Sequence, residues 1–221
     1  MKFTAAFVAA LVGTSSAAVT KTLPKSAGST SFPTAVPVKG SYDASVCKGQ
    51  EETGEKDAMF ILEDGATLSN VIIGASQAEG VHCKGTCWWA DVCEDAVTLK
   101  QTSGTSYING GGAFHADDKI IQFNGRGTVH DYGKLSRSCG NCKDNGGPRN
   151  VIVENSVAVD GGVLCGINTN YGDTCKIINS CQNKGKNCDR YEGNSSGKEP
   201  TKIGSGPDGK YCTVTGFTTN C

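Results

Sequence analysis

The stretch AMFILEDGATLSNVII, residues 58–73, decides the fold. It contains short β-prone runs separated by Glu, Asp, Gly, Ser or Asn, and no sustained helical period of 3.6 residues. Similar runs recur about every 20–25 residues along the chain, which is the spacing of a repeat architecture. Several runs are preceded by related Gly-Thr or Gly-Ala-Thr phrases. These phrases begin at Gly65, Gly85, Gly104 and Gly127.

Self-similarity of short strands at a regular period is typical of a solenoid. We therefore predict an all-β chain folded as a single-stranded parallel β-helix, in which each coil adds one strand to the sheets of the coil before it. Side chains at equivalent positions of successive coils then stack about 4.8 Å apart. An ordinary β-sandwich also has strands at short intervals and is the alternative. The repeated Gly-Thr phrases favour the solenoid.

The composition agrees with a chain of many tight turns. Among 221 residues there are 30 glycines and 6 prolines, and charged residues make up 19%. The formal net charge is −1, whereas a protein that binds nucleic acid normally has a clear basic excess. We therefore expect no nucleic-acid partner.

The N-terminus resembles a secretory signal peptide. Lys2 precedes an apolar run at residues 3–12, and small residues follow up to Ala18. The apolar run is too short for a membrane anchor, and no later stretch is apolar enough to replace it. A buried first helix is the alternative. We expect residues 1–18 to be removed and the protein to be secreted and extracellular, without a membrane partner.

The remainder of the chain reads as one domain with a leader. Residues 19–45 are rich in Ser, Thr, Pro and Lys and are expected to form an extended leader. Residues 46–221 are expected to form the β-helix, with a disulfide-pinned C-terminal cap that begins at Asn168. We expect the protein to act as a monomer.

Twelve cysteines follow the expected cleavage site. An even number in a secreted chain indicates disulfides, which makes the fold disulfide-rich, although spacing does not give the pairing. The alternative is a metal site, because Cys139 and Cys142 have CxxC spacing, but no second matching pair accompanies them. The cysteines are Cys47, Cys83, Cys87, Cys93, Cys139, Cys142, Cys165, Cys175, Cys181, Cys188, Cys212 and Cys221.

Acidic residues gather in the central part of the chain. Glu79, Glu94 and Asp95 would lie on adjacent coils, and such carboxylates suit Ca²⁺, which takes six to eight oxygen ligands in loose geometry. A solvated acidic face explains the same spacing equally well. The neighbouring pair Trp88–Trp89 could stack on a sugar, but buried positions in the solenoid are favoured. Likewise His82 and His115 are better explained by structural roles than as general bases.

At this point the sequence resembles a known family, the fungal pectate lyases of polysaccharide lyase family three. The resemblance covers most of residues 30–185. It implies a right-handed parallel β-helix that cleaves de-esterified polygalacturonate (pectate) by β-elimination with Ca²⁺. The matching phrases are DGATLSNVIIG (64–74), AEGVHCKGTC (78–87), WWADVCEDAVTLK (88–100), GGGAFHADDK (110–119) and GKLSRSCGNC (133–142).

The resemblance also implies roles for individual residues. The calcium ligands would be Glu79, Glu94 and Asp95. Lys119 and Arg137 would be the catalytic bases or charge stabilisers. The resemblance implies Arg137 as the group that takes the proton, although a guanidinium is effectively always protonated. Lys119 is easier to deprotonate, and the choice between the two stays open. Lys100 would contact the substrate.

Two coils are shorter than the family pattern. Cys87 runs directly into Trp88, and only residues 130–132 separate the GTV phrase at 127–129 from the GKL phrase at 133–135. A coil that loses a strand is expected to disturb its stacking on both neighbours. The alternative function is therefore a catalytically impaired paralogue that binds pectin or acts as an effector, or a structural protein without a sugar site.

Overall fold

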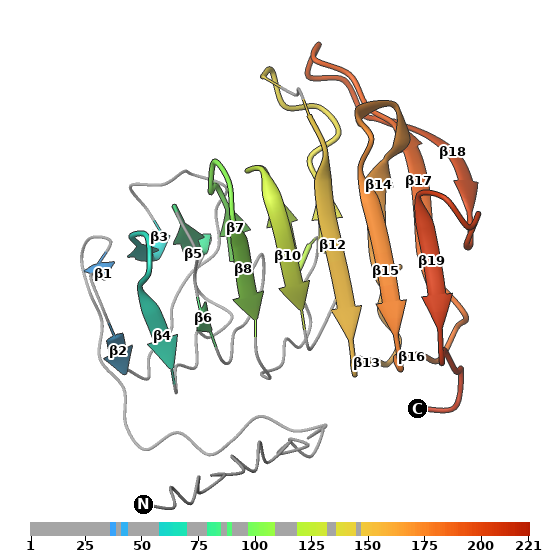
Figure 1. Cartoon of the computed structure of the whole chain (residues 1–221), viewed down its shortest axis with the longest axis horizontal. Helices are drawn as coiled ribbons and strands as arrows, with labels where there is room; N and C mark the ends of the chain where they lie inside the picture. Colours follow the sequence, from blue (N-terminus) through green and yellow to red (C-terminus); the bar gives the residue numbers. More distant parts are fainter. Residues whose placement is uncertain are drawn as a thin grey trace, which may run out of the picture.

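The structure is a computed structural model, and it describes residues 36–38, 41–43, 58–69, 79–84, 88–89, 97–108, 119–131, 136–144 and 147–221. Two large sheets form the solenoid, whose coils are stacked along the long axis in Figure 1. The nine-stranded sheet contains β1 (Val36–Val38), β3 (Ala58–Leu62), β5 (Glu79–Cys83), β7 (Val97–Leu99), β9 (Ile121–Phe123), β11 (Ser136–Ser138), β14 (Cys165–Asn168), β17 (Cys188–Glu192) and β18 (Thr201–Ser205). The eight-stranded sheet contains β2 (Ser41–Asp43), β4 (Thr67–Ser69), β6 (Trp88–Trp89), β8 (Thr105–Ile108), β10 (Gly127–Asp131), β12 (Arg149–Glu154), β15 (Thr174–Ile178) and β19 (Cys212–Thr215).

From β1 to β12 the strands alternate between the two sheets along the chain, and apart from β17 and β18 the neighbours within each sheet come from successive coils. Every neighbouring pair in the two large sheets is parallel except β17 with β18, which is antiparallel. Parallel ladders built from successive coils are the arrangement of a β-helix, whereas a sandwich is built from antiparallel sheets. The predicted parallel β-helix is therefore confirmed.

Alternation along each strand separates the core from the outer face. In β12 every second residue is buried, beginning with Arg149, and the residues between are half-buried. Inward side chains of the nine-stranded sheet stack in rows, for example Leu62, Cys83, Leu99 and Phe123, all of which are at most 1% exposed. These stacked apolar rows supply the hydrophobic stabilisation of a fold that has few local contacts.

The two short coils keep both ladders. The first runs from His82 to its partner Thr98, and the second from Gln122 to its partner Arg137. The first contains β6, whose residue Trp88 pairs with Thr67 and Tyr107 in neighbouring coils. The second contains β10, which pairs with β8 and β12. Stacking on both neighbours therefore continues through both short coils, contrary to the expectation that their shortening would disturb it.

The later coils have a third side and are joined by disulfides. A two-stranded parallel sheet pairs β13 (Val157–Ala158) with β16 (Cys181–Gln182), and a 3₁₀ turn, η2 (Thr169–Tyr171), follows β14. The described residues confirm disulfides, including one between the two cysteines of the CxxC motif. The described pairs are Cys139–Cys142, Cys165–Cys175, Cys181–Cys221 and Cys188–Cys212, and Cys83 is also disulfide-bonded.

Two strands lie within the segment that was expected to be a leader. β1 pairs with β3, and β2 pairs with β4, both in parallel. The ladders of the first coil therefore reach back to Val36, ahead of the predicted boundary at residue 46. The expected signal peptide, residues 1–18, lies outside the described residues.

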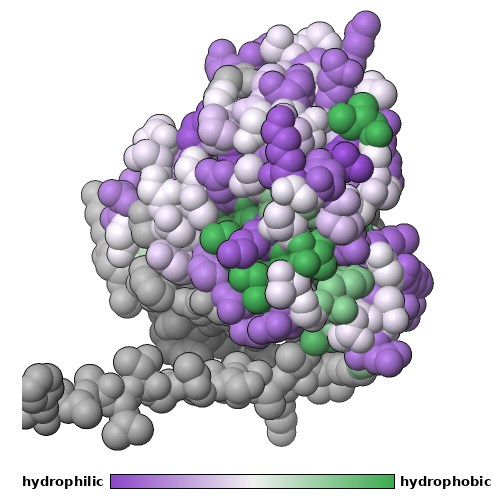
Figure 2. Space-filling model, turned by 45° about the vertical axis from the view of Figure 1, so that its right-hand side comes forward, coloured by the Kyte–Doolittle hydropathy of each residue, from purple (hydrophilic) through white to green (hydrophobic). Residues whose placement is uncertain are grey.

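The C-terminal end of the solenoid is covered by β18, which folds back antiparallel onto β17. Arg190 of β17 pairs with Asp208 (Nη1–Oδ2 3.1 Å). In Figure 2, which brings this end forward, hydrophilic side chains surround small apolar areas; Val159 and Ile203 are the exposed large hydrophobic residues among those described. No helix in the described part of the chain has the length and apolar character needed to cross a bilayer.

Candidate active site on the nine-stranded sheet

One row of residues crosses the outer face of the nine-stranded sheet. The register pairs His82 with Thr98, Thr98 with Gln122, and Gln122 with Arg137. The row continues through Gly166 to Asp189 on the two following strands. Because side chains at paired positions of a parallel sheet point to the same face, these residues share one surface although they are far apart in sequence. The predicted catalytic residue Arg137 is at the middle of this row.

Two residues of later coils hold the Arg137 side chain. Its guanidinium carbon lies 4.2 Å from the ring centroid of Tyr191, a cation–π contact. Gly166, the register partner of Arg137, leaves the space in which the arginine stem lies, because a Cβ at this position would be 3.0 Å from Arg137 Cδ. The guanidinium is therefore held between a bare backbone and an aromatic face.

Burial raises the pKa of the Tyr191 hydroxyl, and the carboxylate of Asp189 adds to the rise while the charge of Arg137 opposes it. Tyr191 also donates a hydrogen bond to Asp189 Oδ2 at 3.4 Å. The phenol stays neutral to higher pH than an exposed tyrosine, so the ring keeps its place under Arg137 in alkaline solution.

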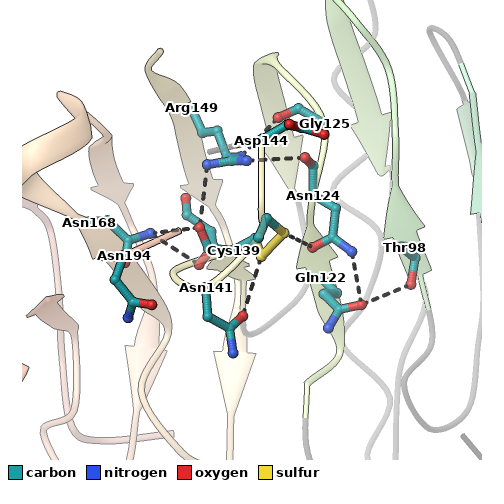
Figure 3. Close-up of a disulfide and its surroundings, with 12 residues drawn as sticks. Thr98, Gln122, Asn124, Gly125, Cys139, Asn141, Asp144, Arg149, Asn168 and Asn194 are labelled. Atoms are coloured by element: carbon teal, nitrogen blue, oxygen red, sulfur yellow. Dashed lines mark hydrogen bonds between the residues drawn. A yellow bond between two sulfur atoms is a disulfide. The ribbon is translucent and has the colours of Figure 1, made fainter. Parts of the chain in front are cut away.

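Gln122 connects Arg137 to the preceding coil. The Gln122 Oε1 atom accepts hydrogen bonds from Thr98 Oγ1 at 3.4 Å and from Asn124 Nδ2 at 3.3 Å. Figure 3 shows these three side chains along adjacent coils. Since both contacts use the amide oxygen, the Nε2 group of Gln122 remains a donor on the outer face beside Arg137.

Lys100 stands directly after β7 and contacts the first part of the row. Its Nζ donates to Nδ1 of His82 at 3.0 Å. His82 is 2% exposed, which agrees with a structural role and not with a general base open to substrate. The predicted substrate-contacting residue is thus on the same sheet face as Arg137, held by a buried imidazole.

The remaining predicted site residues are described only in part. Lys119 is half-buried and stands two residues before β9. Glu79 begins β5 of the same sheet, and its backbone pairs with Ala58. Glu94 and Asp95 lie outside the described residues, as does His115, and only the backbone of Trp88–Trp89 is described. Arg137 and Glu79 therefore belong to strands of the nine-stranded sheet, and Lys100 and Lys119 lie next to strands of the same sheet.

A buried arginine fixes the turns that follow β9 and β11. Arg149 is fully buried, and its guanidinium donates to the backbone carbonyls of Gly125 (2.8 Å), Asn124 (3.1 Å) and Cys139 (3.4 Å). Figure 3 shows these contacts reaching across from β12 to the two turns. Because the turns are bound to one rigid planar group, β9 and β11 keep a fixed relation, and with them Gln122 and Arg137.

A buried carboxylate compensates this charge and extends the network to the next coil. Asp173 Oδ1 accepts the backbone N–H of Arg149 at 2.9 Å, and Oδ2 accepts the N–H and the side-chain amide of Asn168 at 3.0 and 3.1 Å. Burial lowers the pKa of Arg149 to about 10; the charge of Arg126 adds to this, and Asp173 opposes it. Arg149 therefore remains a cation at neutral pH.

Comparison with known proteins identifies the family to which these features belong. The model of the pectate lyase family matches residues 20–198, most of the chain. The chain belongs to the pectate lyase family. Pectate lyase E of Emericella nidulans is 47% identical over 212 residues, covering 86% of this chain and 83% of that protein. A probable pectate lyase F of Aspergillus fumigatus is 51% identical over 188 residues, covering 78% and 77%.

Solved pectate lyases share the fold. Pectate lyase PelI of Erwinia chrysanthemi, determined in complex with tetragalacturonic acid, has a TM-score of 0.63 and 29% identity, and the match covers 82% of this chain and 70% of that one. Pel3 of Pectobacterium carotovorum has a TM-score of 0.66 and 28% identity over 83% and 69%. The fungal pectate lyase resemblance and the right-handed β-helix expected from sequence are confirmed.

The residues that hold Arg137 and its neighbours in this pectate lyase were not predicted from the sequence. Gln122 could have been found, because it lies at an outward position of the alternating run Ile120–Phe123 that follows Lys119. Tyr191 and Gly166 could not, because the coils between them and Arg137 differ in length and hide the register. Arg149 directly precedes the β-prone run at residues 150–153, and nothing in its local sequence indicates that it is buried.

Proposed function

We propose that this chain is a secreted, calcium-dependent enzyme that cleaves de-esterified polygalacturonate by β-elimination and releases unsaturated oligogalacturonates. The observation that carries the proposal is Arg137, held by Tyr191 and Gly166 on an outer sheet face that also presents Gln122 and Lys100. The family to which the chain belongs supports the reaction class. The solved complex of PelI with tetragalacturonic acid supports the substrate class.

The proposed reaction needs positive charge at a defined place. The C5 proton of a galacturonate unit moves to a base, and its electron pair forms the C4–C5 double bond. The bond from C4 to the glycosidic oxygen then breaks, and this oxygen takes a proton from solvent. Negative charge develops on the neighbouring uronate carboxylate, where fixed cationic donors stabilise it. Arg137 supplies such a donor, since its guanidinium fork matches a carboxylate.

Lys119 and Arg137 are the two candidate bases. A base must lose its proton before it can accept one, and a guanidinium is effectively always protonated in proteins. A lysine ammonium group gives up its proton more readily than a guanidinium. Lys119→Arg and Arg137→Lys separate the roles: the substitution at the base moves the ascending, acidic limb of the kcat profile to higher or lower pH, whereas the substitution at the charge stabiliser lowers kcat without moving that limb.

Glu79, Glu94 and Asp95 would hold the calcium ion. All three are carboxylates, the hard oxygen ligands that Ca²⁺ prefers. When bound there, calcium supplies charge that offsets the repulsion between an acidic site and an acidic polymer and stabilises the developing anion. Lys100, fixed by His82, would bind a further uronate carboxylate.

The test is cleavage of polygalacturonate by the full chain. We expect ultraviolet absorbance of unsaturated product in the presence of calcium and none after a chelator is added, with activity restored by calcium alone. Arg137→Ala should remove product formation while the thermal unfolding midpoint is unchanged. Folded wild-type protein that forms no product with calcium would contradict the proposal; retention on a pectate gel would then favour the binding paralogue.

Secretion has its own measurement. Protein expressed with residues 1–18 in a fungal host should appear in the medium with Val19 as its first residue, because the small residues before it form the cleavage site. Retention in the cells, or an uncleaved N-terminus, would contradict this part of the proposal.

A further inference from the structure

A pocket of about 550 Å³ lies beside the strands that follow Arg137. It is formed by residues 162–163, which precede β14, by residues 185–189 at the start of β17, and by the covering strand β18 with Gly206 after it. Lys186, Asn187, Asp189, Lys202 and Ser205 line it, together with glycines that leave backbone exposed. Glycines place no side chain in the way of a ring, so a sugar unit can approach the backbone closely.

The pocket and the candidate active site are linked through the sheet, because Asp189 lines the pocket and Arg137 belongs to the same row. Asp189 belongs to the same outer row as Arg137, two strands further along the sheet, which corresponds to about 10 Å. Tyr191 links Arg137 to the pocket residue Asp189. Its ring packs against the Arg137 guanidinium, and its hydroxyl donates a hydrogen bond to the Asp189 carboxylate. A polymer that lies across Arg137 along the axis of the solenoid reaches this pocket with its next units.

Positive charge recurs at one edge of the sheet. Lys119 stands three residues before Gln122, and Lys186 stands three residues before Asp189, so both are placed at the same edge of the outer row. The edge thus carries basic residues before β9 and before β17. A polyanion that binds the late coils meets cations directly.

The lysines of the pocket are arranged to bind a carboxylate. Asp189 bonds to Lys202 Nζ at 2.7 Å and to Ser205 Oγ at 2.7 Å, and these contacts lower its pKa although burial alone would raise it. Asp189 therefore stays ionised and fixes Lys202, using one of the three donors of the ammonium group. Lys186 is exposed, and the Asn187 Oδ1 atom accepts the N–H of Cys188, which leaves the Asn187 amide donor.

We propose that this pocket binds an additional galacturonate unit of the polymer on which Arg137 acts, with Lys186 and Lys202 contacting the uronate carboxylate and Asn187 and Ser205 contacting hydroxyls. The proposal rests on the proposed function for its ligand class. It adds a binding site on the C-terminal side of Arg137, whereas the predicted calcium ligands precede Arg137 in the sequence. The pocket contributes affinity for long chains and takes no part in the elimination itself.

The first test is equilibrium binding of hexagalacturonate by calorimetry, with calcium present. Lys186→Gln and Lys202→Gln should each raise Kd by about 3- to 10-fold, since each removes a charge-assisted hydrogen bond. The matched control is Lys184→Gln: this exposed lysine, two residues away, pairs with Asp160 and does not line the pocket. It should leave Kd within about 2-fold. An unchanged Kd in the double variant Lys186→Gln/Lys202→Gln overturns the proposal.

The second test separates the pocket from the lyase activity. For a wild-type enzyme that forms product, the double variant should raise KM for polygalacturonate about 10-fold with kcat nearly unchanged, because the pocket contributes uniform binding. The same substitutions should not affect cleavage of the shortest oligomer that is turned over. An unchanged KM in the double variant contradicts the proposal that the pocket binds a galacturonate unit, and it does not contradict the proposed lyase activity. A wild type that forms no product contradicts the lyase proposal, and the binding test still decides on the pocket.

A third measurement needs neither activity nor a variant. Acetylation of the folded wild-type protein, followed by mass spectrometry, reports the accessibility of each lysine. Hexagalacturonate should slow the modification of Lys186 and Lys202 by several-fold and leave Lys184 unaffected. Equal rates with and without hexagalacturonate at Lys186 and Lys202 overturn the proposal, and this result does not depend on how any variant folds.

Discussion

The short coils and the later coils differ in how they complete one turn of the solenoid. Thr98 follows its register partner His82 by 16 residues, and Arg137 follows Gln122 by 15. Gly166 follows Arg137 by 29 residues, and Asp189 follows Gly166 by 23. The later coils use the extra residues for the third side, which contains β13 and β16. The short coils pass between the two large sheets without such strands in their described residues.

This difference shows that the number of residues in a coil does not determine where a site residue lies on the sheet. Both ladders persist through the short coils, so paired residues stay in register whatever lies between the sheets. The predicted chemistry is concentrated in the earlier coils. The contacts that hold Arg137 come from the later ones, through Gly166 and Tyr191. The candidate site therefore contains residues from both regions. A substitution in the later coils can be tested by its effect on the activity of Arg137 in the short coil.

The largest effect is expected from Arg149→Met, which removes the guanidinium that binds the turns of the short coil to β12. Buried carbonyls lose their donors and Asp173 loses its compensating charge, so the free energy of unfolding should fall by about 3–5 kcal/mol. Denaturant unfolding measures this. Lys176→Met, at an exposed position of β15, is the control and should change stability by less than about 0.5 kcal/mol. Equal stability of the two variants would show that the network does not join the regions.

Gly166→Ala tests how the later coils position Arg137. The new methyl group would lie 3.0 Å from Arg137 Cδ and 3.5 Å from Tyr191 Cε2, so the arginine must move. Because catalysis is sensitive to shifts of about 1 Å, kcat should fall by at least about 10-fold. The matched control is Gly204→Ala, whose methyl group would crowd Arg190 and not Arg137. An unchanged kcat for Gly166→Ala would show that Gly166 does not position Arg137 for catalysis.

A smaller effect is expected at Tyr191. Replacement by Leu removes the aromatic face, and kcat should fall about 3- to 10-fold, the value of a partly desolvated cation–π contact. Replacement by Phe keeps the face and loses only the bond to Asp189, so kcat should stay within about 2-fold. Steady-state kinetics of the two variants distinguish the roles. Similar losses in both would assign the effect to the hydroxyl group.

The smallest effect concerns the end of the later coils and depends on pH. Asp208 Oδ1 accepts the N–H groups of Lys210, Tyr211 and Cys212. Although burial alone would raise its pKa, these bonds and Arg190 lower the pKa of Asp208 to about 2.

A carboxyl group with a lowered folded-state pKa stabilises the fold fully above its unfolded value of about 4 and loses that contribution as pH falls toward 2. Asp208→Asn should therefore lower Tm by about 2–4 °C at neutral pH, as the loss of one capping group would, and reduce the fall of Tm between pH 4 and 2. Thermal unfolding monitored by circular dichroism at several pH values measures both. An unaltered acid profile would contradict the assignment.

Much of the fold could be predicted from the sequence, because its information is local. Runs such as residues 59–62 and 150–153 alternate or are continuously apolar, and the structure forms β3 and β12 there. The phrase that begins at Gly104 leads into β8, and the phrase that begins at Gly127 starts β10; both glycines have positive φ angles that favour glycine. The parallel pairing of strands could be predicted because a repeat of short strands at a regular period indicates coils that stack in the same direction.

The site could be predicted only where residue type alone carries the chemistry. Arg137 and Lys100 were predicted from matching phrases, and both lie at the nine-stranded sheet. The residues that orient them, Tyr191 and Gly166, depend on register across coils of 29 and 23 residues, which no local pattern specifies. The strands within residues 36–43 were not predicted for a similar reason. The segment β1 forms a strand by pairing with β3, and its own sequence does not indicate that partner.

The reversed direction of β18 has a consequence for solubility. A stack of parallel coils could in principle continue indefinitely, because each last strand offers unpaired N–H and C=O groups to a further strand. In the nine-stranded sheet that last strand is β18, which runs against the others, and its Lys202 side chain is 48% exposed. At this sheet, another molecule that presented its first coil would therefore meet a strand of opposite direction and a charged side chain. The reversal interrupts the parallel ladder of the nine-stranded sheet only, because β19, the last strand of the eight-stranded sheet, keeps the parallel direction.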